Sequence, residues 1–195
     1  MRPFYERSLE DRQALTSAAI RERRTLIERW SALEEAEAAH WSARSSLAAK
    51  LLQDQASVAD FGCGTMNLRH HLRPDQRYVG VDVVARNGET LVCDLNLDTP
   101  PETGADAAAL LGVLEYIFDP RGVLEHLSRR YHVLVASYCI TDAEEPQSDR
   151  RQHAWVNDFS EKDMTELFEQ SGWTLVESQA VDGLQKMWRL RSSSR

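Results

Sequence analysis

The sequence predicts an α/β fold with a mostly parallel sheet of about seven strands, a reversed late strand and an N-terminal helical cap. First, short apolar runs alternate with helical segments from residue 57 onward, a pattern typical of a parallel sheet covered on both faces. Second, residues 18–53 contain neither proline nor glycine and are rich in helix formers. Third, only Asp182 and Gly183 separate the last two apolar runs, which predicts an antiparallel hairpin.

The length and composition indicate a soluble protein of one domain with an appended segment. The chain has 195 residues, of which 42% are hydrophobic and 28% charged, as in ordinary globular proteins. We expect a helical cap over residues 1–53 and a ligand-binding core over residues 54–195. No apolar run approaches the ~18 residues of a membrane span, and the N-terminus lacks the apolar segment of a secretion signal. We therefore expect a cytoplasmic protein with no membrane partner.

Charge and cysteine content exclude several classes of function. The net charge of −8 repels a phosphate backbone, so a nucleic-acid partner is not expected. Cys63, Cys93 and Cys139 are odd in number and far apart, which suits neither a disulfide framework nor a zinc site. We expect three buried thiols and no metal.

The predicted elements follow in order. In the cap, Leu26, Trp30 and Leu33 recur at helical spacing, which predicts one long helix or two shorter ones. The predicted strands cover residues 57–61, 77–81, 90–93, 106–111, 132–138, 174–181 and 184–190, and the predicted helices cover residues 66–72, 120–131 and 160–171. Ser160 is a plausible N-cap for the last helix, with Asp163 three residues on.

Two connections in the first half of the sheet are too short for a crossover helix. The segment 83–89 has seven residues, and the segment 95–105 contains two prolines and a glycine. A crossover helix with its loops needs about 10–12 residues. We therefore expect loops here and one thinly covered face of the sheet.

Three acidic residues follow the first three strands. Asp60, Asp82 and Asp94 lie where open α/β sheets bind their ligands, at the carboxyl ends of the strands. Gly62 and Gly64 let the backbone turn tightly and approach a ligand. Asp82 follows Gly64 by about the distance at which a carboxylate binds ribose hydroxyls. The ligand is therefore expected to contain a nucleoside.

The charge of the loop argues against a phosphorylated nucleoside. A dinucleotide-binding loop has a third glycine where this sequence has Asn67, and Asp60 would lie beside the anion. At ~4 Å and an effective dielectric constant of ~20, two like charges cost on the order of 4 kcal/mol. A positively charged nucleoside reverses that sign, and S-adenosylmethionine is such a molecule.

Five segments, taken together, resemble a known family. "VADFGCGTMNL", "YVGVDVV", "LVCDLN" and "ADAAALLGVLEYIFDP" are similar, in that order, to the first four motifs of class I S-adenosylmethionine-dependent methyltransferases. "SGWTLVE" resembles the usual end of that fold. The resemblance covers roughly residues 41–190 and implies a Rossmann-like fold. Met66 stands where the family often has a further glycine, and the second and third crossovers are abridged.

The resemblance implies a cofactor site at four strand ends, with S-adenosyl-L-homocysteine as the product. Its implied residues are Asp60, Gly62, Cys63, Gly64, Asp82, Val83, Asp94, Leu95, Gly112 and Val113. In the family, the first acid faces the methionine ammonium group, the second holds the ribose hydroxyls and the third reads the adenine amino edge. For Asp82 and Asp94, an ordinary turn or capping role is the alternative.

The residues that act on the methyl acceptor are less clearly marked. Glu115 and Tyr116 follow the fourth strand, and Tyr116 is predicted either to orient the acceptor or to lie on the rim. His153, in a long polar connection, is a candidate base or a surface histidine. Arg150 and Arg151 are either ligands for an anionic acceptor or solvated charges.

We expect methyl transfer to an oxygen or nitrogen of a small-molecule acceptor. The alternatives are a non-catalytic S-adenosylmethionine-binding or regulatory subunit, and a protein or RNA methyltransferase. A homodimer through the N-terminal helices is a further expectation.

Overall fold

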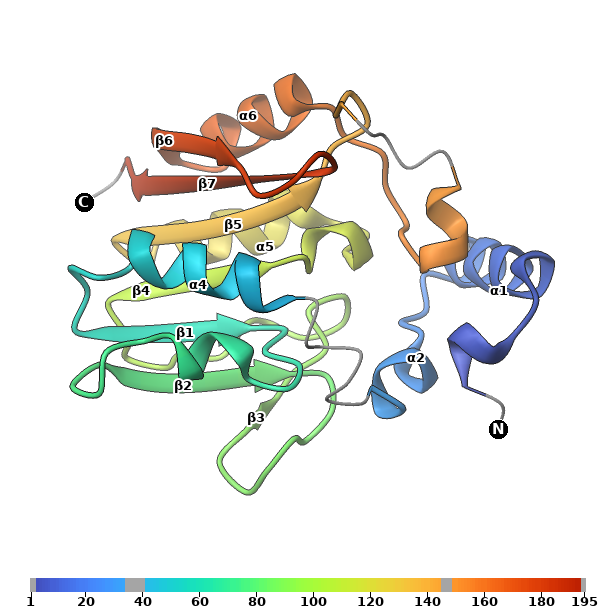
Figure 1. The fold of residues 1–195 in the computed structure, drawn as a ribbon, viewed down its shortest axis with the longest axis horizontal. Coiled ribbons are helices and arrows are strands. Elements are labelled where there is room, and N and C mark those ends of the chain that lie inside the picture. The colour runs from blue at the N-terminus through green and yellow to red at the C-terminus, as the bar shows by residue number, and fades with distance from the viewer. Residues whose placement is uncertain (1–2, 34–40, 145–148, 194–195) are drawn as a thin grey trace.

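The computed structural model describes residues 3–33, 41–144 and 149–193, and its centre is a seven-stranded sheet (Figure 1). The strands are β1 (Ser57–Phe61), β2 (Arg77–Asp82), β3 (Leu91–Val92), β4 (Ala107–Leu111), β5 (Val133–Cys139), β6 (Trp173–Ala180) and β7 (Gln185–Ser192). Their order in the sheet is β3-β2-β1-β4-β5-β7-β6. β7 pairs antiparallel with both β5 and β6, whereas the pairs among β1 to β5 are parallel. The predicted fold class, with one reversed late strand, is confirmed.

The centre of the sheet positions the site. β1 and β4 lie side by side and are buried along their whole length. The chain first winds outward through β2 and β3, and then returns past β1 to β4. The strand order therefore reverses between β1 and β4, and ligands of open α/β sheets bind in the crevice beyond that point.

Helices cover both faces of the sheet. On one face, α4 (Ser42–Leu51) packs Ala48 and Leu51 into a cluster with Val58 of β1 (Figure 1). On the other face, α5 (Pro120–Ser128) and α6 (Glu161–Gln170) pack against a cluster that includes Phe61 and Leu110. Neighbouring residues of β1 thus face opposite layers, as the alternation of side chains along a strand requires.

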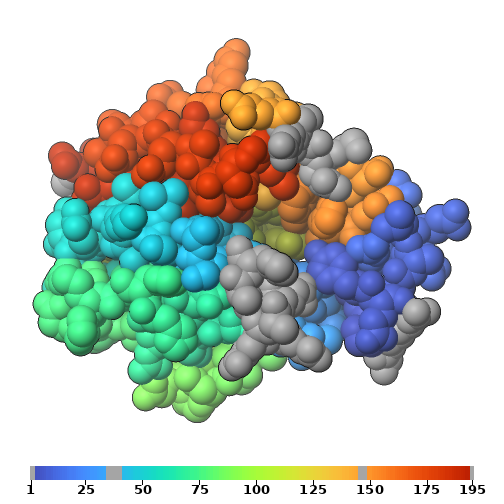
Figure 2. All heavy atoms as spheres, in the orientation of Figure 1, coloured from blue at the N-terminus to red at the C-terminus, as the bar shows by residue number. Residues whose placement is uncertain are grey.

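The cap is a small separate layer beside the carboxyl ends of the parallel strands (Figure 1). It contains α1 (Leu9–Glu22) and α2 (Ile27–Ser31), and α1 packs with the 3₁₀ turn η5 (Arg150–His153). Residues 149–160, which include η5 and lead into α6, are called the late connection. Figure 2 shows the blue cap atoms against the orange atoms of this connection. The first 53 residues therefore contribute to two layers, because α4 packs on the sheet. A domain division at residue 53 stays a prediction.

Several local predictions can be compared with the structure. The N-cap of α6 is confirmed as a capping box, in which Asp163 N donates to Ser160 Oγ (3.1 Å) and Ser160 N donates to Asp163 Oδ2 (2.9 Å). The connections 83–90 and 93–106, which the structure describes completely, contain no helix, as expected. The helix predicted over 66–72 is instead a single 3₁₀ turn, η3 (Asn67–His70). Met66 precedes this turn at φ +60°, a left-handed conformation that no helix continues through.

No helix in the described segments combines the length and the apolar character that a membrane crossing needs.

Candidate functional site

A cavity opens at the carboxyl ends of the central strands, between the sheet and the cap. Its volume is about 1020 Å³ including the open mouth. The lining residues come from β1 to β5, from α4 and from the cap. All ten residues that the sequence assigned to the cofactor line the cavity: Asp60, Gly62, Cys63, Gly64, Asp82, Val83, Asp94, Leu95, Gly112 and Val113.

Two glycines line the cavity where β1 and β4 end. Gly62 has φ +72°, and a Cβ at this position would lie 2.4 Å from the Val113 side chain. Gly112 has φ +68°, and a Cβ there would lie 2.2 Å from Nη1 of Arg44. The left-handed backbone conformation favours glycine at both positions, and at Gly62 the close approach of Val113 also excludes a side chain.

Asp60 is a buried carboxylate at the end of β1. It is 3% exposed, and Oδ2 accepts a hydrogen bond of 2.8 Å from the Tyr78 hydroxyl. Burial raises the pKa of Asp60 to about 7; the hydrogen bond from Tyr78 and the charge of Arg44 oppose this, while Asp82 adds to it. A cation placed beside Asp60 would favour its ionised form.

Asp82 is held from two sides. Its Oδ2 accepts from Gly64 N at 2.8 Å, and its Oδ1 accepts from Val84 N at 3.0 Å. Arg86 donates to Oδ1 at 3.1 Å and also to the backbone oxygen of Trp30 in the cap at 3.0 Å. The carboxylate of Asp82 is therefore oriented, and it connects the glycine loop to the cap.

Asp94 has one engaged oxygen and one without a partner. Its Oδ1 accepts from Thr25 Oγ1 at 2.9 Å and from Asn96 N at 3.0 Å. Oδ2 is buried and has no hydrogen-bond partner among the described residues. A buried acceptor without a donor is costly, and an amino group of a ligand in the cavity would satisfy it. This orphaned oxygen fits the adenine amino edge of S-adenosylmethionine.

Glu115 is a buried carboxylate in the 3₁₀ turn η4 (Leu114–Tyr116), which follows β4. It is 1% exposed, and Oε1 accepts from Cys139 N at 2.9 Å. Oε2 has no hydrogen-bond partner in the part of the chain that the structure describes. Burial raises the pKa of Glu115, and backbone hydrogen bonds and the nearby Arg44 oppose that shift.

Arg44 is a cavity residue that the sequence reasoning missed. It projects from α4, stacks over Trp41 with its Cζ 5.2 Å from the ring centroid, and lies beside the backbone of Gly112. Its Nε is buried and has no hydrogen-bond partner within the described segments. Burial lowers the pKa of Arg44, and the charges of Glu115 and Asp60 among others oppose this. Its place in the first turn of a helix made mostly of small and apolar residues, "SARSSLAAKL", is the pattern that could have indicated it.

Tyr116 lines the cavity together with two tryptophans. Its ring lies edge-on to Trp30 of α2, at 4.6 Å between centroids, and its hydroxyl accepts from Trp155 Nε1 at 3.1 Å. Tyr116 therefore lies within the site, at its border with the cap.

His153 lies outside the set of side chains that line the cavity, as far as the described residues show. Its ring centroid is 5.1 Å from that of Trp155 and 6.3 Å from that of Tyr5. The role of His153 as a base stays a prediction.

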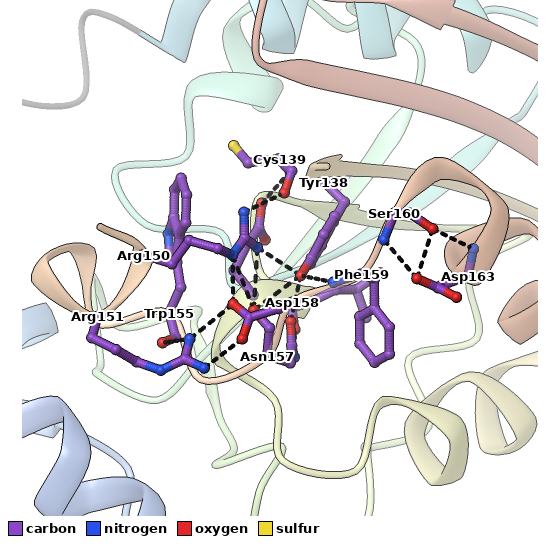
Figure 3. A network of polar contacts seen from close by, with 12 residues as sticks. Tyr138, Cys139, Arg150, Arg151, Trp155, Asn157, Asp158, Phe159, Ser160 and Asp163 are labelled. Carbon is purple, nitrogen blue, oxygen red and sulfur yellow. Dashed lines mark hydrogen bonds and ion pairs between the residues drawn. The ribbon is translucent and has the colours of Figure 1, made fainter. Parts of the chain in front are cut away.

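Arg150 and Arg151 hold the late connection in place (Figure 3). Arg150 is 6% exposed and donates to Cys139 O at 2.8 Å and to the Tyr138 hydroxyl at 2.7 Å. Both arginines pair with Asp158, at 2.9 Å from Arg150 and 2.5 Å from Arg151. These contacts give both cations a structural role and leave an anionic acceptor without support from them.

The three cysteines are buried and free, as expected. All three line the cavity. Burial raises the pKa of Cys93 to about 11 and also raises the pKa of Cys63 and Cys139. They are therefore uncharged thiols that add apolar surface. The described residues include no cluster of side chains suited to hold a metal ion.

A family comparison agrees with this geometry. The methyltransferase-domain family matches residues 30–178, which is more than half of the chain. The chain belongs to this family. With the strand order described above, this methyltransferase is of class I, the S-adenosylmethionine-dependent enzymes. No curated protein sequence matches it significantly.

Solved methyltransferase structures share the fold of this enzyme. The 1,6-didemethyltoxoflavin N1-methyltransferase of Burkholderia thailandensis, solved with S-adenosylhomocysteine, has a TM-score of 0.62 at 19% identity, over 93% of this chain and 87% of that one. The N,N-8-amino-8-demethyl-D-riboflavin dimethyltransferase of Streptomyces davawensis has a TM-score of 0.66 at 17% identity, over 94% and 68%. Human N-acetylserotonin methyltransferase, solved with S-adenosylmethionine, has 0.61 at 16% identity, over 95% of this chain and 56% of that one. At these low sequence identities, the structural similarity shows that this chain shares the fold of those proteins.

Proposed function

We propose that this methyltransferase transfers the methyl group of S-adenosylmethionine to an oxygen or nitrogen of a small molecule. The observation that carries the proposal is the unpartnered, buried Oδ2 of Asp94 in a cavity that the glycine loop also lines. The three neighbours described above are all named for small-molecule acceptors, which supports an acceptor of that size.

Different cavity residues bind different parts of the cofactor. Asp94 accepts from the adenine amino group through Oδ2, and Asp82, oriented by Gly64 N and Arg86, accepts from the ribose hydroxyls. At the methionine end, Asp60 attracts the ammonium group and Arg44 attracts the carboxylate. When bound, S-adenosylmethionine supplies a methyl group on a positively charged sulfur.

Glu115 is the group suited to take a proton from the acceptor. The hydrogen bond from Cys139 N fixes its carboxylate, and the unpartnered Oε2 remains available to an O–H or N–H donor in the cavity. Its raised pKa strengthens it as a base whenever it is ionised, and the neighbouring Arg44 favours that ionised form. The remaining contribution of the chain is alignment, since an in-line displacement depends on the geometry of approach.

Calorimetry tests the cofactor assignment. We expect micromolar binding of S-adenosylmethionine and S-adenosylhomocysteine, and no binding of NADH, whose pyrophosphate would meet the acids of the loop. Asp94→Ala should weaken both interactions, whereas Asp75→Ala, at an exposed position outside the cavity, should not. Binding of NADH in preference to S-adenosylhomocysteine would overturn the proposal.

Three finer expectations remain predictions. They are a cytoplasmic location, an anionic acceptor, and a homodimer through the N-terminal helices. A non-catalytic subunit would bind the cofactor equally well, so turnover with an acceptor distinguishes it from an enzyme that acts alone.

A further inference from the structure

The cap closes the cavity with aromatic side chains. Trp30 from α2, Tyr116 after β4 and Trp155 from the late connection all line it, and Trp41 lies at the start of α4. Three of the five tryptophans of the chain thus line this one cavity, while Trp173 and Trp188 are buried in the core beneath α5 and α6. The acidic residues proposed to bind the cofactor do not need this many aromatic side chains around them.

These rings are held in position by contacts within the protein. Trp30 and Tyr116 lie edge-to-face at 88°, and the guanidinium of Arg29 lies 4.7 Å from the ring centroid of Trp30. Arg150, anchored on β5, lies 4.6 Å from the ring centroid of Trp155. Cation–π and edge-to-face contacts of this kind fix ring orientation. The aromatic wall is therefore formed before a ligand arrives.

One polar edge of the wall is engaged within the protein, because Trp155 Nε1 donates to the Tyr116 hydroxyl. Trp155 therefore offers a ligand ring surface rather than a hydrogen bond. The Tyr116 hydroxyl accepts in this contact and keeps its own O–H as a donor. Beside the wall lies the buried Oε2 of Glu115, the residue next to Tyr116, which has no hydrogen-bond partner among the described residues.

We infer that the methyl acceptor is a planar aromatic molecule that stacks on Trp30, Tyr116 and Trp155 and directs a ring hydroxyl or ring amine at Glu115. This inference rests on the proposed function and names its substrate class. Flat rings gain attraction from aromatic faces beyond simple burial, and they lose little conformational freedom on binding compared with a flexible chain. The apolar wall with one buried acceptor matches a flat molecule with one acidic hydrogen.

The chemistry balances without any further reactant. The acceptor's proton passes to Oε2 of the ionised Glu115 while a lone pair of its oxygen or nitrogen forms a bond to the methyl carbon. The bond from that carbon to sulfur breaks, and its electron pair stays on the sulfur, which becomes a neutral thioether. Neutral Glu115 then returns its proton to water.

Matched pairs of probes test the inference on the full chain saturated with S-adenosylhomocysteine. The first pair is 2-naphthol and decahydro-2-naphthol, and the second is 1-naphthol and decahydro-1-naphthol. Each pair shares its carbon skeleton and hydroxyl and differs in planarity. We expect at least one aromatic probe to bind at least tenfold more tightly than its saturated partner by calorimetry.

Variants of the wall give a second readout. Trp30→Leu and Trp155→Leu should weaken the aromatic probe about tenfold, while Trp30→Phe and Trp155→Phe, which keep a ring, should stay within about threefold of the parent chain. Phe159→Leu is the matched control, because this partly buried aromatic residue lies outside the cavity lining and its ring contacts Tyr138 rather than a ring of the wall. Circular dichroism and the S-adenosylhomocysteine affinity of each variant show that it is folded.

The outcomes separate this inference from the proposed function. If S-adenosylhomocysteine binds but both pairs bind equally, or neither aromatic probe binds at 1 mM, the aromatic acceptor is overturned and the methyltransferase assignment stands. If S-adenosylhomocysteine itself fails to bind, the proposed function is overturned, and this inference with it. Tight binding of the aromatic probe that both Leu variants retain would also contradict the assigned wall.

Discussion

The two ends of the cavity are built in different ways. The cofactor end consists of strand ends and a glycine loop, where Asp60, Asp82 and Asp94 are held by hydrogen bonds from nearby backbone and side chains. The acceptor end consists of aromatic rings contributed by the cap and the late connection, Trp30 and Trp155 among them. The first recognises charge and hydrogen-bonding pattern; the second offers shape and ring surface.

The two ends are connected by a few named contacts. Thr25 in the cap donates to Asp94, and Arg86 links Asp82 to the backbone oxygen of Trp30. Asn96 extends the first link, because its amide donates to Thr25 Oγ1 and to the backbone oxygen of Tyr116. Two of the acids proposed to bind the cofactor, Asp82 and Asp94, are therefore also attachment points of the cap, which contributes Trp30 to the aromatic wall.

The largest expected effect separates chemistry from cofactor binding. Glu115→Gln keeps the size of the side chain and its hydrogen bond from Cys139 N, but it removes the base. We expect kcat to fall by about 10²–10⁴-fold, the range for general-base catalysis. The affinity for S-adenosylhomocysteine should stay within about twofold. Unchanged kcat with an acceptor would remove Glu115 from the reaction.

The next effect lies entirely at the cofactor end. Asp82→Ala removes a charged hydrogen-bond acceptor and should weaken S-adenosylhomocysteine binding by about 1.5–3 kcal/mol. Calorimetry measures this directly. Asp75→Ala, a variant at an exposed position outside the cavity lining, is the matched control. Equal affinity in the Asp82 variant and the parent chain would contradict the ribose assignment.

Asp60 should make the cofactor end dependent on pH. Its folded pKa of about 7 lies above the unfolded value, so the native state binds this proton more tightly than the unfolded state does. The stability that Asp60 contributes is fully present below its unfolded pKa and is lost as the pH rises through 7. Asp60→Asn should therefore be more stable than the parent chain at pH 8, on the order of 2 kcal/mol, and similar to it near pH 4.

Cofactor binding should favour the ionised form of Asp60, whereas folding favours the protonated form. Because the ammonium group favours the ionised carboxylate, the affinity of the parent chain for S-adenosylmethionine should rise with pH up to about 7 and then level off. In Asp60→Asn that rise should be absent. Urea denaturation and calorimetry between pH 5 and 8 measure both, and a variant that is less stable than the parent chain at pH 8 would contradict the assigned charge.

The smallest expected effect concerns the link between the two ends. Thr25→Val removes the hydroxyl that bridges Asp94 and Asn96, with little change in volume. We expect S-adenosylhomocysteine affinity to fall by about 0.5–1.5 kcal/mol, the range for one hydrogen bond, and the KM of the acceptor to rise as well. Thr165→Val, whose hydroxyl bonds within α6, is the control. A change in KM alone would show that the link positions only the acceptor wall.

Local patterns in the sequence predicted most of the fold. Each predicted strand corresponds to an observed one within about two residues, because apolar runs between turn residues are set by short-range preferences. The helix predicted after the glycine loop was the main difference. Met66 adopts a left-handed conformation that its own side chain does not favour, so the loop geometry imposed by neighbouring strands overrode the local preference.

The sequence by itself determined the cofactor end, since its acids and glycines occupy fixed positions at strand ends, and strand topology brings such ends together. Only the tertiary structure decided the acceptor end. Arg44, Thr25 and Trp30 are far in the sequence from Glu115 and Trp155, and their meeting in one cavity depends on how the cap packs. The tertiary structure also gave Arg150 and Arg151 a structural role in the late connection. Their pairing with Asp158 became apparent only in the folded chain.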